Sequence, residues 1–303
     1  MRLITLVCGV IFLSLLFSPA PAGGFAVALQ SEADQARDAF LAADAAAAAF
    51  MALLDHPEAL EDRRVQMKVF RSLSAREPEI AQAALALTLR ASQLGEAAMI
   101  KRRLDMAFIG PNVDQKAAIL DIARNNPQLL QDLRVISLIS DSLQTGSPLQ
   151  DTALSILESE PSLLNYPAIA AALVDLPGQA DQVTVKLPEF QAFKEKVEPV
   201  YQKMGADDKS CVSCHKTHPI MQLLPLEEAQ SEDAMLKQHY RSALRVVNLQ
   251  EPETSLILVK PTVPEPPQGT HSASPQTHGG GVRWQKGSPQ YQAILDWIQT
   301  ADR

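Results

Sequence analysis

The sequence contains one Cys-x-x-Cys-His motif, at residues 211–215. Side chains at positions i and i+3 of a helical turn lie on one face, so Cys211 and Cys214 can reach the same edge of a flat ring. His215 follows directly and can offer a neutral imidazole to a metal at the centre of that ring. The spacing therefore predicts covalent attachment of one c-type haem, with two thioether bonds and His215 as the proximal axial ligand.

Three other interpretations of the motif remain open. A structural zinc site needs four Cys or His ligands, but the chain has no second Cys pair and no His-x3–5-His pattern. A thioredoxin-like redox pair belongs in a βαβ unit, which the sequence does not indicate. A simple disulfide between Cys211 and Cys214 would leave His215 without a role. Haem attachment is the interpretation that uses all three residues.

Residues 1–28 have the pattern of a secretory signal peptide, because Arg2 precedes an apolar run that ends at Phe17 and is followed by small residues. Cleavage is expected after Ala22 or Ala28, and the alternative is a retained N-terminal anchor. After cleavage the chain keeps two cysteines, both in the motif, and no membrane span is expected in the mature chain. Haem attachment suits an oxidising compartment. We therefore expect a secreted or periplasmic bacterial protein.

The composition bounds the fold and the partners. A chain of 303 residues is long enough for two domains. Its net charge of −8 and its pI near 5.3 argue against nucleic acid or an anionic membrane surface as the partner. Aromatic residues make up only 5%, while Ala and Leu are abundant. This bias favours closely packed helices, so we expect an all-α protein.

Residues 29–180 are expected to form a helical domain. Apolar spacing predicts helices over about 31–54 and 58–74 and a third that begins at Pro78. Residues 119–130 align with residues 153–164, with a period of 34 positions between their prolines. Such a period resembles HEAT-like helical repeats, which offer a concave surface to a protein partner. The alternative is an irregular helical bundle.

Residues 186–303 are expected to form a second helical domain around the motif. Aromatic and apolar residues at helical spacing predict a helix from Pro188, and Pro199 should kink or interrupt it. Two short helices are expected over about 222–246. A terminal helix is expected over about 288–301, with Trp297 in its apolar stripe.

Five segments of this half share a pattern with a known family: Phe193 to Val200, the haem motif, Glu253 to Pro261, His278 to Val282 and Tyr291 to Ile298. Together they resemble a planctomycete-type cytochrome c domain, which is similar to the class I cytochrome c fold. The resemblance covers about residues 186–302 and implies a mono-haem electron-transfer domain. It also implies that the first and last helices cross, with Trp297 against Phe190 or Phe193. The chain departs from the family in an insert around residues 270–276.

The sixth ligand of the iron decides between an electron carrier and an enzyme. We expect His278, because it lies 63 positions after His215 and precedes Gly279 to Gly281, whose missing side chains allow close approach to a flat ring. It also falls on the His-Gly-Gly segment of the family. His271 and Met235 are the alternatives. A five-coordinate iron, with His278 in solvent, also remains open.

These features predict an exported mono-haem cytochrome that transfers single electrons to or from a redox partner protein and is not an enzyme. The helical half would serve as a docking scaffold. One alternative is a haem-dependent enzyme or gas sensor with an open distal site. Another is a helical interaction scaffold in which the haem is structural.

Overall fold

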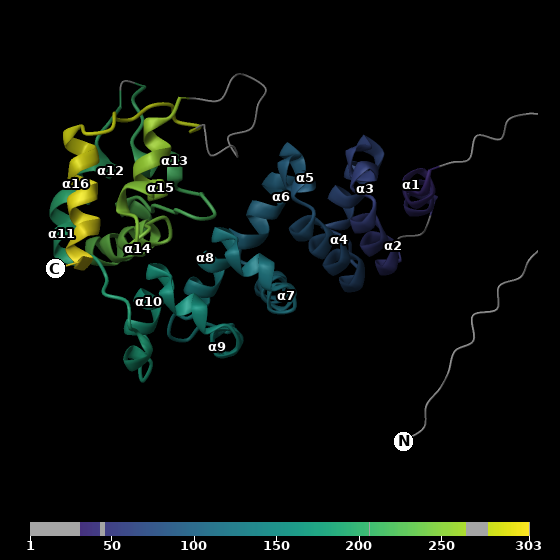
Figure 1. Cartoon of the computed structure of the whole chain (residues 1–303), viewed down its shortest axis with the longest axis horizontal. Coiled ribbons are helices and arrows are strands. Elements are labelled where there is room, and N and C mark those ends of the chain that lie inside the picture. The colour runs from purple at the N-terminus through teal and green to yellow at the C-terminus, as the bar shows by residue number, and fades with distance from the viewer. Residues whose placement is uncertain (1–30, 43–45, 206, 265–277, 303) are drawn as a thin grey trace, which may run out of the picture.

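The structure, a computed structural model, describes residues 31–42, 46–205, 207–264 and 278–302. Every regular element in these ranges is helical, so the predicted all-α class is confirmed. The expected signal peptide and His271 lie outside the described residues. Figure 1 shows helices α1 to α10 following one another along the long axis, with α11 to α16 gathered at one end.

The N-terminal part consists of α-helices joined by short 3-10 turns. The α-helices are α1 Glu32–Ala42, α2 Ala47–Ala52, α3 Arg63–Ser72, α4 Pro78–Arg90, α5 Ser92–Glu96, α6 Ala98–Ile109, α7 Val113–Arg124, α8 Leu133–Ser142, α9 Gln150–Ser159 and α10 Pro167–Val174. The 3-10 turns are η1 Leu53–Asp55, η2 Pro57–Glu61, η3 Pro127–Gln131, η4 Pro161–Asn165 and η5 Ala180–Gln182.

A 3-10 turn that begins with proline precedes an α-helix at η2, η3 and η4. Proline suits this first position because it has no N–H to leave unpaired. The side chain of Asp62 caps α3 by accepting from the backbone N–H of Arg64 at 2.7 Å, and Asp132 caps α8 through Arg134 at 2.8 Å. The predicted single helix over 58–74 is therefore wrong, since the extended Asp62 separates η2 from α3.

The helix expected over 31–54 also differs from the structure, which has α1, α2 and η1 in this range. The helix expected to begin at Pro78 is confirmed as α4. Buried side chains of α1 to α10 form one apolar cluster, here called the first cluster, which runs from Phe40 to Leu176. These contacts join each helix to its neighbours along the chain.

The C-terminal part is built around a second cluster, which combines residues from Phe193 to Ile298 with Ala168 and Ala171 of α10. Its elements are α11 Phe190–Ala192, the π-helix η6 Phe193–Val197, α12 Glu198–Gln202, α13 Cys211–His215, η7 Leu226–Glu228, α14 Glu232–Leu244, η8 Pro252–Thr254, α15 Leu256–Val259, η9 Lys260–Thr262, α16 Pro289–Ile298 and η10 Gln299–Asp302. Helix α10 packs on α14 and belongs to both clusters. The division at residues 180–186 stays a prediction.

The predicted interruption of the first helix of this part at Pro199 is confirmed. The π-helix η6 ends just before it, and α12 restarts with Pro199 in its first turn. Proline cannot donate to the preceding turn, and a π segment is one way for a helix to absorb the lost bond.

The two short helices expected over 222–246 correspond to the 3-10 helix η7, of three residues, and the longer α-helix α14. Ser231 fixes its start, because the Ser231 side chain accepts from the backbone N–H of Ala234 at 3.2 Å.

The predicted contact of the terminal helix with the first helix is confirmed. The ring centroids of Phe193 and Trp297 lie 5.3 Å apart, and the indole N–H of Trp297 donates to the carbonyl of Glu189 at 3.2 Å. Tyr240 of α14 contacts both rings and extends the aromatic group. No helix in the described part of the chain is long and apolar enough to cross a membrane.

Candidate functional site

Helix α13 holds the Cys-x-x-Cys-His motif in a single helical turn. A reciprocal pair of serines caps its start: the backbone N–H of Ser213 donates to Ser210 Oγ at 3.2 Å, and that of Ser210 donates to Ser213 Oγ at 3.0 Å. The Ser-x-x-Ser spacing around Cys211 is a signal that sequence reasoning missed. Cys211 packs against the second cluster, Cys214 is exposed, and neither forms a disulfide in the structure.

The environment of Cys211 does not suit a catalytic thiolate. Burial raises the pKa of its thiol to about 11, although the nearby Arg283 guanidinium opposes this shift. A reactive cysteine needs a lowered pKa. Cys211 is therefore a protonated thiol at neutral pH, which argues against a thioredoxin-like pair.

A backbone carbonyl fixes the orientation and the tautomer of the His215 ring. Its Nδ1 lies 3.1 Å from the carbonyl oxygen of Met221. A carbonyl can only accept, so Nδ1 carries the hydrogen and Nε2 carries the lone pair. Burial lowers the pKa of the imidazole, and His278 and Arg283 add to this effect. His215 is therefore neutral and has the tautomer of a metal ligand that binds through Nε2.

His278 has the same arrangement on a loop far along the chain. Its Nδ1 donates to the carbonyl of Gly281 at 2.8 Å, which again places the lone pair on Nε2. The ring centroids of His215 and His278 lie 6.3 Å apart, and their planes are inclined by 28°. A Cβ on Gly280 would come within 3.2 Å of His278 Cε1. Glycine at this position therefore lets the loop turn tightly beside the imidazole.

His218 lies beside His215 but has the opposite tautomer. Its Nδ1 accepts from the backbone N–H groups of Ile220 at 3.2 Å and Met221 at 3.1 Å, so Nε2 carries the hydrogen. Burial, together with the smaller effects of the nearby His215 and Lys101, lowers the pKa of His218 to about 3. The ring centroids of His215 and His218 lie 4.8 Å apart.

The other candidate ligands lie elsewhere. Met235 is buried on α14, and His271 is outside the described residues. His239 is fully buried, with Nδ1 2.9 Å from Glu198 Oε2 and Nε2 2.8 Å from the carbonyl oxygen of Leu224. Both of its nitrogens already have hydrogen-bond partners within the protein, so His239 is not placed to bind a metal.

An ion pair that the sequence did not predict joins the two sides of the site. The guanidinium of Arg283 binds both carboxylate oxygens of Asp207, at 2.7 and 2.9 Å. It also donates to the carbonyl of Lys209 at 3.3 Å, just before the motif. The pair connects the turn that leads into α13 with the loop that carries His278. No sequence pattern could reveal it, because its members are 76 positions apart.

Two buried polar atoms near the motif lack a hydrogen-bond partner among the described residues: Tyr201 Oη and Trp284 Nε1. Burial raises the pKa of Tyr201 well above its usual value, and Cys211 and Glu198 add to this. The hydroxyl therefore stays protonated and is a donor. Both groups belong to the second cluster. Each is a donor that an acceptor other than the described residues would have to satisfy.

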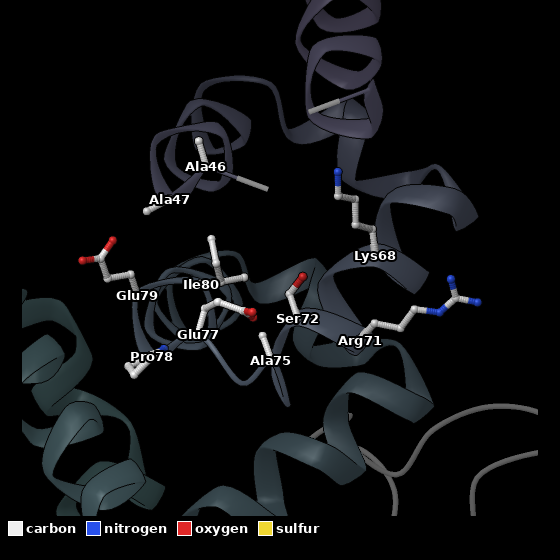
Figure 2. Close-up of a pocket in the computed structure, with 10 residues that line it drawn as sticks. All are labelled: Ala46, Ala47, Lys68, Arg71, Ser72, Ala75, Glu77, Pro78, Glu79 and Ile80. Carbon is white, nitrogen blue, oxygen red and sulfur yellow. The ribbon is translucent and has the colours of Figure 1, made fainter. Parts of the chain in front are cut away.

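The helical half has a surface hollow between α2, α3 and the start of α4, shown in Figure 2. Lys68 and Arg71 line one side, and Glu77 and Glu79 line another. Lys68 Nζ donates to the carbonyl of Phe40 at 2.5 Å, which gives this cation a structural role. No histidine or cysteine is among the described residues that line the hollow.

Comparisons with protein-family models, curated proteins and solved structures found no match for this chain. In the described part of the molecule, no three His, Cys, Asp or Glu side chains are grouped to hold a metal ion by themselves. The site therefore rests on its own geometry, in which the imidazoles of His215 and His278 lie near each other.

Proposed function

We propose that this chain is an exported c-type cytochrome that holds one covalent haem c and transfers single electrons. The observation that carries the proposal is the pair formed by His215 and His278, 6.3 Å apart between centroids. Each ring donates its Nδ1–H to a backbone carbonyl. Metal-bound histidines characteristically use their second nitrogen in this way.

The separation of the two rings supports a shared iron. An imidazole nitrogen lies about 2 Å from a bound metal and the ring centroid about 1 Å further out, so two imidazoles on opposite sides of one metal have centroids about 6 Å apart. Two histidines alone make a poor metal site, but a porphyrin supplies the four remaining nitrogens. The donor set therefore fits a haem better than it fits a bare ion.

Other features of the site also fit a haem. Cys211 and Cys214 occupy one helical turn next to His215 and would form the thioethers. Gly280 keeps the backbone beside His278 free of a side chain. A haem carries two carboxylates, which could accept from the unsatisfied donors Tyr201 Oη and Trp284 Nε1.

The bound haem would supply the one-electron couple of its iron. The chain would set the potential of this couple: His215 and His278 would act as axial ligands, and the carbonyls of Met221 and Gly281 would make both imidazoles more basic. Electron transfer is favoured over catalysis because His278, as the second ligand of the iron, would occupy the position that a substrate or gas needs. Two imidazoles also imply a lower potential than one imidazole and a methionine.

We extend the proposal to the architecture. The contact between Phe193 and Trp297 supports a class I-like, planctomycete-type cytochrome c domain over residues 186–302. The recurring order of helix, 3-10 turn and helix supports HEAT-like repeats in the helical half, which would dock a protein partner. A signal peptide at residues 1–28 would direct export to the periplasm.

Covalent haem is tested by expressing the full chain with haem-attachment machinery and staining a denaturing gel for haem. The wild-type band should stain, and the double variant with Cys211→Ala and Cys214→Ala should not. Lys216→Ala is the matched control, because this exposed residue adjoins the motif. Full staining of the double variant would refute the proposal. Reversible potentiometric cycling then distinguishes an electron carrier from a scaffold with a structural haem.

A further inference from the structure

The segment at residues 220–224 lies between His215 and helix α14. On one side, the Met221 carbonyl accepts from His215 Nδ1–H at 3.1 Å. The backbone N–H of Leu223 also donates to the carbonyl of His215 at 3.1 Å. The segment therefore holds both the ring and the backbone of the proposed proximal ligand.

Helix α14 holds the opposite side of the same segment. Gln238 and Ser242 both donate to the carbonyl of Gln222, each at 2.6 Å. His239 donates to the carbonyl of Leu224 at 2.8 Å, and Arg245 Nη1 donates to that of Ile220 at 3.2 Å. Alternate carbonyls thus point to α14, and the carbonyl of Met221 between them points to His215. This is the alternation of an extended chain.

Arg245 has a second partner in the helical half. Its Nη2 pairs with Asp141 of α8, 104 positions earlier in the chain. The guanidinium is buried, with its side chain 7% exposed, whereas Asp141 is half-exposed. One side chain thus links α8 to the backbone next to the proposed axial ligand. Figure 1 shows α8 and α10 beside the end of the molecule that contains α14.

We infer that Arg245 is a positioning residue through which the helical half influences the hydrogen bond of His215 and hence the potential of the haem. The inference rests on the proposed function. A strong Nδ1–H···O bond makes the imidazole more basic and stabilises ferric iron. Loss of the Arg245 anchor would let the carbonyl of Met221 move away from His215. The bond would weaken and the potential would rise.

The chain offers a matched control one turn earlier, within α14, which Arg245 directly follows. Arg241 of α14 pairs with Asp175 at 2.6 Å, just after α10, so it also joins the two halves. Unlike Arg245, it has no hydrogen bond to residues 220–224 in the described structure. Lysine keeps the charge but lacks the planar fork that binds two acceptors. Arg245→Lys therefore removes a contact with residues 220–224, whereas Arg241→Lys does not. Both variants keep the positive charge.

The experiment measures the midpoint potential and the Nδ1–H proton resonance of His215 in the full, haem-loaded chain. We expect Arg245→Lys to raise the potential and shift the resonance, while Arg241→Lys leaves both at their wild-type values. Equal behaviour of the two variants would overturn the inference. A wild type without covalent haem would overturn the proposed function as well, so the two failures are distinguishable.

A double-mutant cycle tests the connection to the helical half. Asp141→Asn should raise the potential in the wild type and have a smaller effect when combined with Arg245→Lys. In the control cycle, Asp175→Asn should have the same effect with or without Arg241→Lys. Additive behaviour of Asp141→Asn and Arg245→Lys would show that Asp141 acts only as a charge, and would overturn the coupling.

Discussion

His215 and His278, 63 positions apart, face each other with ring centroids 6.3 Å apart and planes inclined by 28°. The Nδ1–H of each ring donates to a nearby backbone carbonyl, so Nε2 carries the lone pair in both and is the atom that would bind iron in the proposed site. This arrangement makes the distal position testable by single substitutions.

His278→Ala should convert a low-spin, six-coordinate haem to a high-spin one that binds carbon monoxide readily, because it removes one axial ligand. The optical spectrum with and without carbon monoxide measures this change. Met235→Leu is the control, since Met235 is the methionine alternative and is buried on α14. A low-spin His278→Ala protein, or a high-spin Met235→Leu protein, would place the distal ligand elsewhere.

Asp207→Asn should loosen the distal loop, because it breaks the bidentate pair that ties Arg283 to the turn before the motif. We expect faster carbon monoxide binding by the ferrous protein than in the wild type, measured by stopped flow. Asp208→Asn is the matched control: this neighbour has a positive φ of 55°, which asparagine tolerates, and the side-chain hydrogen bonds of Arg283 in the described structure go to Asp207 and Lys209. Equal rates of carbon monoxide binding in the two variants would show that the ion pair of Asp207 and Arg283 does not hold the distal loop in place.

His218→Gln should reduce the loss of stability in acid. Burial lowers the pKa of His218 from 6.5 to about 3, so the unfolded chain takes up a proton in this range and the folded chain does not. Neutral, buried His218 therefore does not lower the unfolding free energy above pH 6.5. The unfolding free energy falls progressively as the pH drops from 6.5 towards 3, because only the unfolded chain is protonated there.

Urea unfolding of the haem-loaded protein at several pH values measures this effect. Between pH 4 and 6, the pH slope of the unfolding free energy should be smaller in the variant by about 1.4 kcal/mol per unit. Glutamine can still accept from the backbone through its side-chain oxygen. Identical slopes would contradict the buried, neutral state of His218.

The sequence predicted those features that depend on local spacing. The motif at residues 211–215, the start of α4 at Pro78 and the contact between Phe193 and Trp297 all follow from periodic apolar residues, proline positions or a family resemblance. Helix boundaries were less predictable. The caps at Asp62 and Ser231 depend on single side-chain hydrogen bonds, and these decide whether a helical pattern forms one element or two.

The contacts that surround the site could not be predicted from the sequence. The pair of Asp207 and Arg283 and the pair of Asp141 and Arg245 join residues 76 and 104 positions apart. The key partner of His215 is a backbone carbonyl, which any residue at position 221 would supply. Interactions of this kind leave no pattern in one sequence.

Glu198→Ala should destabilise the C-terminal part by about 3–5 kcal/mol, because it leaves the fully buried His239 without its charged partner. Glu198→Gln should cost less, since its side-chain oxygen can still accept from His239. Urea unfolding of the haem-loaded chain measures both. Glu195→Ala, an exposed position on the preceding turn, should change stability by less than about 0.5 kcal/mol. A small effect of Glu198→Ala would show that the buried pair contributes little.

The electron paramagnetic resonance and near-infrared magnetic circular dichroism spectra of the ferric wild-type protein test the central claim most directly. Ligation by His215 and His278 predicts a low-spin signal with the near-infrared charge-transfer band of two neutral imidazoles. A high-spin signal, or the band of an imidazole and a thioether, would contradict this account of the site.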